Sequence, residues 1–384
     1  MVRMKGPTKD THLGRPTKGR RLINPSVECG STVLFSSYDD FRANRPPWHY
    51  GRTGTPTHRA LEESLCDLEG ADNVVLTGSG LEACTLAILS CVTAGGHVLV
   101  TDSAYEPTRT FCDGLLRGFD IETTYFDPQA GREEIAALCR PTTQLIFCES
   151  PGSLTFEVQD LPAIVAGAGE VPVAVDNTYG AGVLLRPLEL GCAISVQALT
   201  KYVGGHSDLL LGAVATAPRL SAKVRRMARM LGISVSGRDV AMAHRGLRTL
   251  HRRLAVHEEN GLGLARFLET HSAIRRVLHP GLDSHPQAAL WARDASGTNG
   301  LFSVIADWED EAVTARFIDH LTLFGLGYSW GGYESLCLPA WPTANRTAVP
   351  WTEGGQVLRF HAGLEDLDDL IEDVAAALAA ATST

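Results

Sequence analysis

Two residues, Asp176 and Lys201, have types and positions that suggest chemistry. Each stands at or just past the C-terminal end of a short apolar run, over residues 173–175 and 193–199. Such runs, bounded by turn residues, are typical of strands buried on both faces of a parallel sheet. Because ligands of open α/β sheets bind beyond the carboxyl ends of the strands, we expect both side chains to face one crevice.

Lys201 is unusual in this chain, which has only five lysines. Between residues 19 and 222, every other permanently basic side chain is an arginine. An ammonium beside Leu199, Tyr202 and Val203 is costly to desolvate unless it is paired or neutralised. A neutral lysine amine is the nucleophile that Schiff-base chemistry needs. The alternative is a structural lysine whose stem packs beside a strand end while its ammonium reaches solvent.

The segments around these two residues resemble motifs of a known family. ALTKYVGGHSD, which contains Lys201, resembles the cofactor-lysine motif of the Cys/Met-metabolism family of pyridoxal-phosphate enzymes, and DNTY resembles that family's aspartate motif. The resemblance implies that Lys201 holds pyridoxal 5'-phosphate covalently and that Asp176 pairs with its protonated pyridine nitrogen. A carboxylate opposite the ring nitrogen keeps that nitrogen protonated, and the protonated ring acts as an electron sink, so the residue type of Asp176 agrees with this role.

Four more motifs, YGR, SGL, AYEP and LRFHAGLED, follow the family's order over nearly the whole chain. The resemblance implies that Tyr105 stacks on the cofactor and takes part in catalysis, and that Arg359 binds the substrate carboxylate. It further implies phosphate binding by Tyr50, Arg52, Gly80, Leu81 and Thr200, and substrate binding by Ser153, Tyr328, Ser329 and Trp330. The phosphate role of Gly80 and Leu81 has independent support, because the first amides of a helix bind phosphate. The carboxylate role of Arg359 has it too, because a guanidinium fork suits a carboxylate.

The fold that the resemblance implies is the α/β fold of pyridoxal-phosphate transferases of fold type I. It has a mostly parallel seven-stranded sheet in a large domain and a smaller C-terminal α/β domain. We expect an N-terminal arm over residues 1–54, a large cofactor-binding domain over 55–250 and a C-terminal domain over 251–384. In the family, the tyrosine and arginine of YGR reach the neighbouring subunit's site, which implies a homo-oligomer, specifically a tetramer built as a dimer of dimers.

Three positions favour the bacterial cystathionine β-lyase branch of the family. Ser153 stands where much of the family has asparagine, Ala198 where it often has serine, and Trp330 where many γ-acting relatives have leucine. The resemblance therefore implies β-elimination from L-cystathionine or a related cysteine S-conjugate, a small amino-acid substrate, giving a thiol, pyruvate and ammonia. Lys201 would remove the Cα proton.

Four other functions stay open at this point. The first is γ-elimination or γ-replacement by a relative in the same family, and the second is a β-lyase for another cysteine conjugate, which departures at His49 and Gly327 could reflect. The third is a catalytically idle regulatory protein on the same fold. The last is a nicotinamide-dependent oxidoreductase, because residues 78–83 fit the pattern G-x-G-x-x-A and Asp102 ends the next apolar run; this function leaves the lysine and the aspartate unexplained.

Composition narrows the class of protein. The 384 residues are 44% hydrophobic, enough for a large core, and the formal charge of −10 argues against a nucleic-acid binder. The sequence contains no run of about 18 apolar residues, so we expect no membrane span. The nine cysteines form no C-x-x-C pair and no H-E-x-x-H occurs, so we expect reduced thiols in a cytoplasmic enzyme, without a metal.

Overall fold

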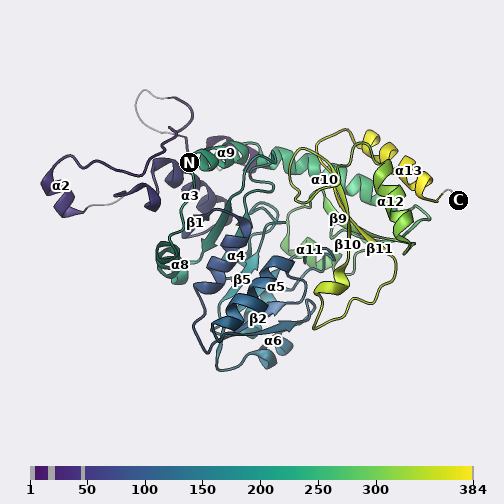
Figure 1. Cartoon of the computed structure of the whole chain (residues 1–384), viewed down its shortest axis with the longest axis horizontal. Coiled ribbons are helices and arrows are strands. Elements are labelled where there is room, and N and C mark those ends of the chain that lie inside the picture. The colour runs from purple at the N-terminus through teal and green to yellow at the C-terminus, as the bar shows by residue number, and fades with distance from the viewer. Residues whose placement is uncertain (1–4, 16–21, 45–47, 383–384) are drawn as a thin grey trace.

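Two sheets organise the computed structural model, which describes residues 5–15, 22–44 and 48–382 (Figure 1). The larger sheet has seven strands in the order β1-β7-β6-β5-β4-β2-β3. In chain order they are β1 (Asn73–Thr77), β2 (His97–Thr101), β3 (Glu122–Phe126), β4 (Thr143–Glu149), β5 (Val173–Asp176), β6 (Ile194–Ala198) and β7 (Gly212–Thr216). Strands β2 to β6 pair in parallel, and β7 runs antiparallel to β6 and β1, so the predicted mostly parallel seven-stranded sheet is confirmed.

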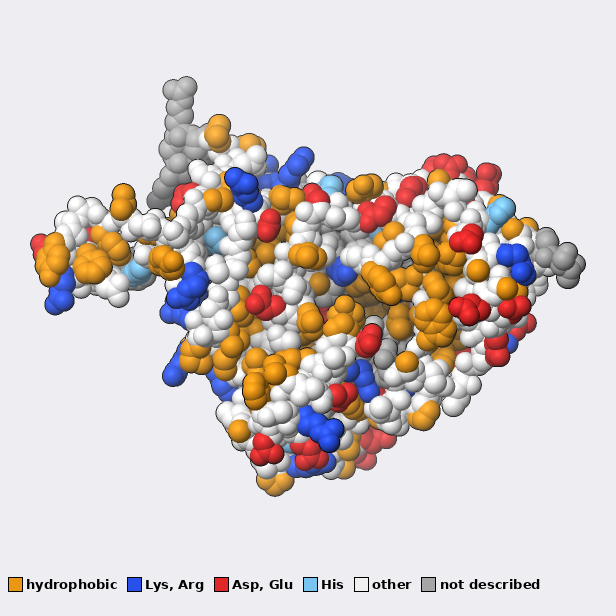
Figure 2. Space-filling view, viewed as in Figure 1, with side chains coloured by type: hydrophobic (Ala, Val, Ile, Leu, Met, Phe, Trp, Pro, Cys, Tyr) orange, Lys and Arg blue, Asp and Glu red, His pale blue; other side chains and the backbone are white. Residues whose placement is uncertain are grey.

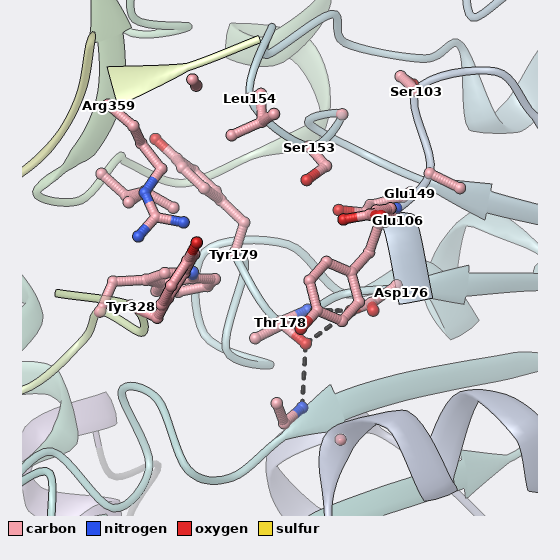
Figure 3. A pocket seen from close by; sticks show the side chains of 18 of the residues that line it. Ser103, Glu106, Glu149, Ser153, Leu154, Asp176, Thr178, Tyr179, Tyr328 and Arg359 are labelled. Atoms are coloured by element: carbon pink, nitrogen blue, oxygen red, sulfur yellow. Dashed lines mark hydrogen bonds between the residues drawn. The ribbon is translucent and has the colours of Figure 1, made fainter. Parts of the chain in front are cut away.

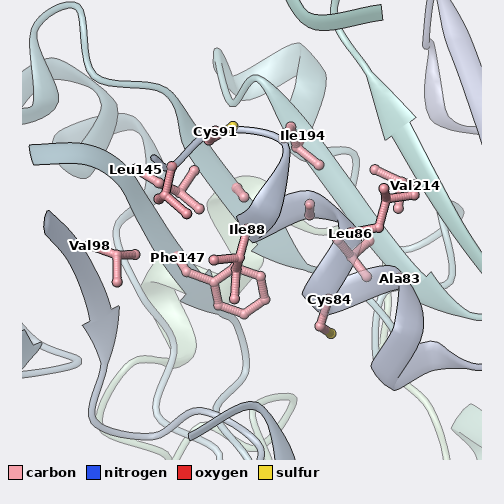
Figure 4. Close-up of a cluster of buried hydrophobic side chains, with 14 of the residues drawn as sticks. Ala83, Cys84, Leu86, Ile88, Cys91, Val98, Leu145, Phe147, Ile194 and Val214 are labelled. Carbon is pink, nitrogen blue, oxygen red and sulfur yellow. The ribbon is translucent and has the colours of Figure 1, made fainter. Parts of the chain in front are cut away.

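The large sheet is buried because its strands are apolar on both faces, as parallel strands covered by helices must be. Helix α4 (Gly80–Leu89) packs on one face through a cluster that includes Ile88, Phe147 and Val214 (Figure 4). The helix begins where the Ser79 hydroxyl accepts a hydrogen bond from the Glu82 N–H, at 3.1 Å. The first turn of α4 lies next to Ala198, at the end of β6.

The smaller sheet is antiparallel, in the order β10-β11-β9-β8. Its strands are β8 (Ile274–Leu278), β9 (Leu301–Ala306), β10 (Leu336–Ala340) and β11 (Gln356–His361). Helices α10 (Leu250–Glu269), α12 (Glu311–His320) and α13 (Leu367–Thr382) cover it and share a core with Phe302 and Phe360. The boundary at residue 250, which stays a prediction, coincides with the start of α10.

The remaining helices surround the large sheet and the N-terminal segment. They are α1 (Gly6–His12), α2 (Tyr38–Ala43), α3 (Pro56–Glu69), α5 (Glu106–Phe111), α6 (Arg132–Leu138), α7 (Leu161–Ala168), α8 (Pro218–Leu231), α9 (Gly237–Leu247) and α11 (Ala288–Asp294). The part of the chain expected to be an arm includes residues 1–4, 16–21 and 45–47, which lie outside the described residues. Its described portion contains two short α-helices and extends away from the body near α2 (Figure 1).

Candidate active site

A cavity of about 530 Å³ opens at the carboxyl ends of the parallel strands and is also lined by residues of the smaller sheet. Eleven of the thirteen residues predicted to bind cofactor or substrate line it: Gly80, Leu81, Tyr105, Ser153, Asp176, Thr200, Lys201, Tyr328, Ser329, Trp330 and Arg359. Figure 3 shows Arg359 and Tyr328 toward one side of this cavity and Asp176, Glu149 and Glu106 toward the other. Asp176 and Lys201 therefore face one crevice, as predicted.

Lys201 lies in a turn just after β6, where its N–H donates to the Ala198 carbonyl at 3.1 Å. Burial and the nearby Arg359 guanidinium lower the pKa of the Lys201 amine to about 8. Its Nζ donates to the Ser329 hydroxyl at 2.7 Å and lies 5.3 Å from the centre of the Trp330 ring. An amine with this pKa is partly neutral near physiological pH, which suits a nucleophile or a base and not a structural ammonium.

Asp176 ends β5, and a local turn holds its carboxylate. The Thr178 hydroxyl donates to Oδ1 at 2.6 Å and the Thr178 N–H donates to the same oxygen at 3.0 Å (Figure 3). The Thr178 hydroxyl also accepts the Ala198 N–H at 2.9 Å, which ties this turn to the end of β6. The Cys84 thiol donates to Oδ2 at 3.4 Å. Burial raises the pKa of Asp176, and the Thr178 bonds oppose that rise by favouring the carboxylate.

Tyr105 precedes α5 and is 46% exposed, and a hydrogen bond fixes its backbone. The Tyr105 N–H donates to the Glu149 Oε2 at 2.7 Å, and Glu149 is the last residue of β4. Burial and the carboxylates of Glu149 and Asp176 raise the pKa of the Tyr105 phenol. The phenol therefore keeps its proton at neutral pH in the ligand-free protein and is a donor there.

Arg359, on β11, approaches the cavity from the smaller sheet. Its Nη2 donates to the Ser329 carbonyl at 2.9 Å, which leaves the rest of the guanidinium fork for a ligand. Burial lowers the pKa of Arg359 to about 10, so the side chain remains charged at neutral pH. Tyr328 is 91% exposed although it lines the cavity, and Ser153 is held through its N–H, which donates to the Ser103 carbonyl at 2.8 Å.

Two elements could receive a phosphate. Gly80 and Leu81 are the first residues of α4, where a helix leaves its amides without intrahelical acceptors. A Cβ on Gly80 would lie 2.4 Å from the Ala198 Cβ, so only glycine lets the helix start this close to β6. The Thr200 hydroxyl donates to the Leu211 carbonyl and accepts the Leu211 N–H, and its role as a phosphate donor stays a prediction.

Tyr50 and Arg52 lie outside the cavity of their own chain, on the N-terminal segment. Arg52 donates from Nη1 to the Arg229 carbonyl at 3.4 Å, and Tyr50 is 48% exposed. Side chains of Leu34, Tyr38 and Phe41 are also exposed on this segment, where Figure 2 shows hydrophobic atoms around α2. The role predicted for Tyr50 and Arg52 is in a neighbouring subunit's site and stays a prediction.

Sequence reasoning missed three groups at the site. Glu149 and Thr178 hold Tyr105 and Asp176 as described, and Cys84 touches Asp176. The rule that selected Asp176, a polar residue at the carboxyl end of a buried strand, applies equally to Glu149. In contrast, Asp102 is not free to bind a ribose, because it pairs with Arg109 at 2.8 Å and accepts backbone N–H groups of the 347–349 segment.

The donor set of the cavity fits pyridoxal phosphate. That group needs an amine, an acid for its ring nitrogen, an aromatic surface and phosphate donors. Lys201, Asp176, Tyr105 and the start of α4 supply these from four different elements around one cavity. Within the described residues, no cluster of His, Cys, Asp or Glu could hold a metal, and no helix has the length and apolarity to cross a membrane.

Comparisons with known proteins agree with this geometry. Residues 8–379 match the model of a family described as Cys/Met metabolism PLP-dependent enzymes. The chain is 42% identical to a cystathionine β-lyase of Bordetella avium, over 96% of each chain, and 39% identical to that of Escherichia coli, over 96% of this chain and 98% of the relative. The structure of a cystathionine γ-synthase from Xanthomonas oryzae pv. oryzae, in complex with aminoacrylate and cysteine, superposes with a TM-score of 0.91 at 29% identity, over 99% of both chains.

Proposed function

The chain belongs to the Cys/Met-metabolism family of pyridoxal-phosphate-dependent enzymes, and we propose that within it the chain is a carbon–sulfur β-lyase. Its substrate would be L-cystathionine or a related cysteine S-conjugate. The observation that carries this proposal is the setting of Lys201, whose amine has a pKa of about 8 and touches Ser329 beside the Trp330 ring. Names of β-lyase relatives at about 40% identity support it further.

In this proposal the chain's residues bind the substrate and move one proton. Arg359 binds the α-carboxylate through its guanidinium fork, and the Ser329 hydroxyl keeps the Lys201 amine in place. Lys201 removes the Cα proton and returns it to the sulfur as the Cβ–S bond breaks, with the Tyr105 phenol as a second proton donor. Pyridoxal phosphate supplies the electron sink, held by Asp176 at its ring nitrogen. With one water, cystathionine would give homocysteine, pyruvate and ammonia.

The test is to identify the keto acid released by the purified, yellow protein from L-cystathionine. We expect pyruvate and one equivalent of free thiol, and the Lys201→Ala variant should release neither. Release of 2-oxobutyrate would instead assign γ-elimination, and it would contradict the use of Trp330 as an indicator of β-elimination. A yellow protein that leaves cystathionine intact but cleaves another cysteine conjugate would keep the reaction and change the substrate.

Of the two main alternatives, one has specific support and the other is disfavoured. γ-Elimination or γ-replacement is favoured by the close superposition on the cystathionine γ-synthase structure. A catalytically idle regulatory protein is disfavoured by the reactive set in the cavity, since a binding module has no physical need for an amine with a pKa near 8 beside a buried carboxylate.

We also infer that the active form is a homo-oligomer, and we expect a tetramer in the cytoplasm. The exposed apolar side chains near α2 and the position of Tyr50 and Arg52 away from their own cavity support a partner subunit. Each of the nine cysteines, all within the described part of the chain, has a free thiol, which suits a reducing compartment. Light scattering of the cofactor-loaded protein would give the oligomeric state.

A further inference from the structure

The segment that carries Ser329 and Trp330 is held at two points by one strand. Arg359 and His361 lie two residues apart on β11, so their side chains leave the same face of the strand. Arg359 donates to the Ser329 carbonyl at 2.9 Å, and His361 accepts the Gly331 N–H on its Nε2 at 3.0 Å. The two contacts bracket Trp330.

This segment needs such a hold because its backbone is in an unfavourable conformation. Ser329 has φ of 81°, in the left-handed region that a residue with a Cβ rarely adopts. Gly331 has φ of 83°, and a Cβ there would lie 2.8 Å from the Tyr202 N and 3.0 Å from the Lys201 Cα. The segment is therefore pressed against the backbone of Lys201, where a small shift would change the contact between Ser329 and the Lys201 amine.

The state of the His361 ring follows from its two partners. Its Nδ1 lies 3.1 Å from the Glu334 carbonyl, which can only accept, so Nδ1 carries the hydrogen. Nε2 is then the acceptor for the Gly331 N–H, and the ring is neutral. Burial and the neighbouring His257 hold the pKa of His361 well below its usual range, in agreement with this assignment.

His361 touches neither the Lys201 amine nor the interior of the cavity. It is 1% exposed and packs between the rings of His257, at 5.1 Å, and Tyr202, at 6.0 Å. Its ring is thus fixed in orientation by packing, while its one free lone pair meets the Gly331 N–H. Its hydrogen bond to Gly331 is the direct link between His361 and the 328–331 segment.

We propose that His361 is a positioning residue: by accepting the Gly331 N–H, it holds the 328–331 segment so that the Ser329 hydroxyl and the Trp330 ring meet the Lys201 amine. The hold on the segment is independent of the reaction catalysed, whereas its effect on turnover rests on the proposed function. Loss of this acceptor leaves a buried N–H unpaired and frees a segment whose backbone resists its present conformation.

The test compares His361→Leu, which removes the acceptor, with His361→Gln, whose side-chain oxygen can replace Nε2. The matched control is His257→Leu, in the same ring cluster, because His257 bonds to the Ala362 carbonyl and not to the segment. Hydrogen exchange of peptides covering residues 325–336 is measured in the cofactor-loaded protein, together with kcat and KM. His361→Leu should exchange about tenfold faster in this segment and lose about tenfold in kcat, whereas His361→Gln should restore both.

Unchanged exchange over 325–336 in a folded His361→Leu protein would overturn the proposal. So would equal acceleration in His257→Leu, because the effect would then be general loosening of the ring cluster. If His361→Leu does not fold, the comparison of His361→Gln with His361→Asn decides, since the shorter amide cannot reach the Gly331 N–H; equal exchange in those two variants would overturn the proposal. Faster exchange without any lyase activity in the parent protein would contradict the proposed function and leave the hold on the segment intact.

Discussion

Glu149 and Asp176 are register partners on neighbouring parallel strands, β4 and β5, so two carboxyl groups lie together at the inner end of the cavity. They cannot both be charged at low cost. Asp176 accepts two hydrogen bonds from Thr178, which stabilise its carboxylate. Burial and the charge of Asp176 raise the pKa of Glu149 well above its usual range, so the proton of the pair belongs on Glu149.

A neutral Glu149 makes Glu149→Gln a mild substitution. Glutamine keeps an oxygen to accept the Tyr105 N–H and carries no charge, so kcat/KM should stay within about threefold of the parent value. Glu149→Leu removes that acceptor and should lose about tenfold or more, because Tyr105 loses its anchor. Steady-state kinetics on both variants measure this; a loss beyond about 100-fold in Glu149→Gln would mean that Glu149 itself exchanges a proton or acts as an anion.

Thr178→Val tests the support of Asp176. Valine has nearly the same shape but cannot donate to the Asp176 Oδ1 or accept the Ala198 N–H. Without the hydroxyl the carboxylate is less stabilised, and kcat should fall about tenfold. Thr178→Ser keeps the hydroxyl and serves as the control, with activity near that of the parent. Equal loss in Thr178→Val and Thr178→Ser would assign the effect to packing and remove the hydrogen bond from the argument.

The pKa of about 8 at Lys201 predicts how the cofactor-free protein takes up pyridoxal phosphate. Only the neutral amine attacks an aldehyde, and its fraction rises with pH through the pKa. The uptake rate, followed by visible absorbance after mixing, should therefore increase from pH 6 and reach half its maximum near pH 8. Nα-acetyl-lysine, with an ordinary amine pKa of about 10.4, provides the control and should keep accelerating beyond pH 9. A protein profile that follows the control would contradict the lowered pKa.

The strands that position the site could be predicted because their residues obey a local rule. Asp176 ends β5 and Lys201 follows β6, and the carboxyl ends of these two strands meet at one edge, as the apolar runs over residues 173–175 and 193–199 predicted. Helix α2 was not predicted, because six residues carry too little periodicity to stand out from an irregular segment. Helix α10 begins at Leu250 without a capping side chain, so no cap marks its start.

Residues that act through tertiary contacts had no local pattern to find. His361 was part of a recognised motif, yet its contact with Gly331 joins positions 30 residues apart. Asp102 illustrates the opposite error, because the G-x-G-x-x-A spacing suggested a ribose ligand, whereas the structure pairs its carboxylate with Arg109 and with the backbone of a segment more than 240 residues away. Spacing along the chain carries no information about which donors the fold brings to a carboxylate.

Glu69 predicts a stability that depends on pH. Burial raises its pKa to about 7, and Gln197 donates a hydrogen bond to it. Between about pH 4.5 and pH 7 the unfolded chain has lost this proton while the folded protein keeps it, so the contribution of Glu69 to stability falls as pH rises. Glu69→Gln cannot ionise and keeps the acceptor. Its free energy of unfolding relative to the parent should rise from pH 5 to pH 8 by as much as about 3 kcal/mol, measured by urea unfolding. A constant difference would place the pKa at its usual value.

Arg52 and Lys201 provide a test of shared active sites. If Arg52 serves the site of a partner subunit, as its place outside its own cavity suggests, then Lys201→Ala and Arg52→Ala fall in the same site of a mixed dimer. One site then receives Lys201 from the Arg52→Ala chain and Arg52 from the Lys201→Ala chain, and is intact. When either variant is expressed alone, every site lacks Lys201 or Arg52, so activity should be low when the cofactor is limiting.

Random assortment sets the size of the expected rescue. With two-fold symmetric pairs, about half of all co-expressed dimers are mixed and each has one intact site in two, so activity should recover to about a quarter of the parent value. A Lys201→Ala chain that also carries Arg52→Ala is the control and should restore nothing to the Arg52→Ala chain. If Arg52 acted within its own chain, both sites of a mixed dimer would be defective, and co-expression of the two single variants would leave activity as low as in either alone.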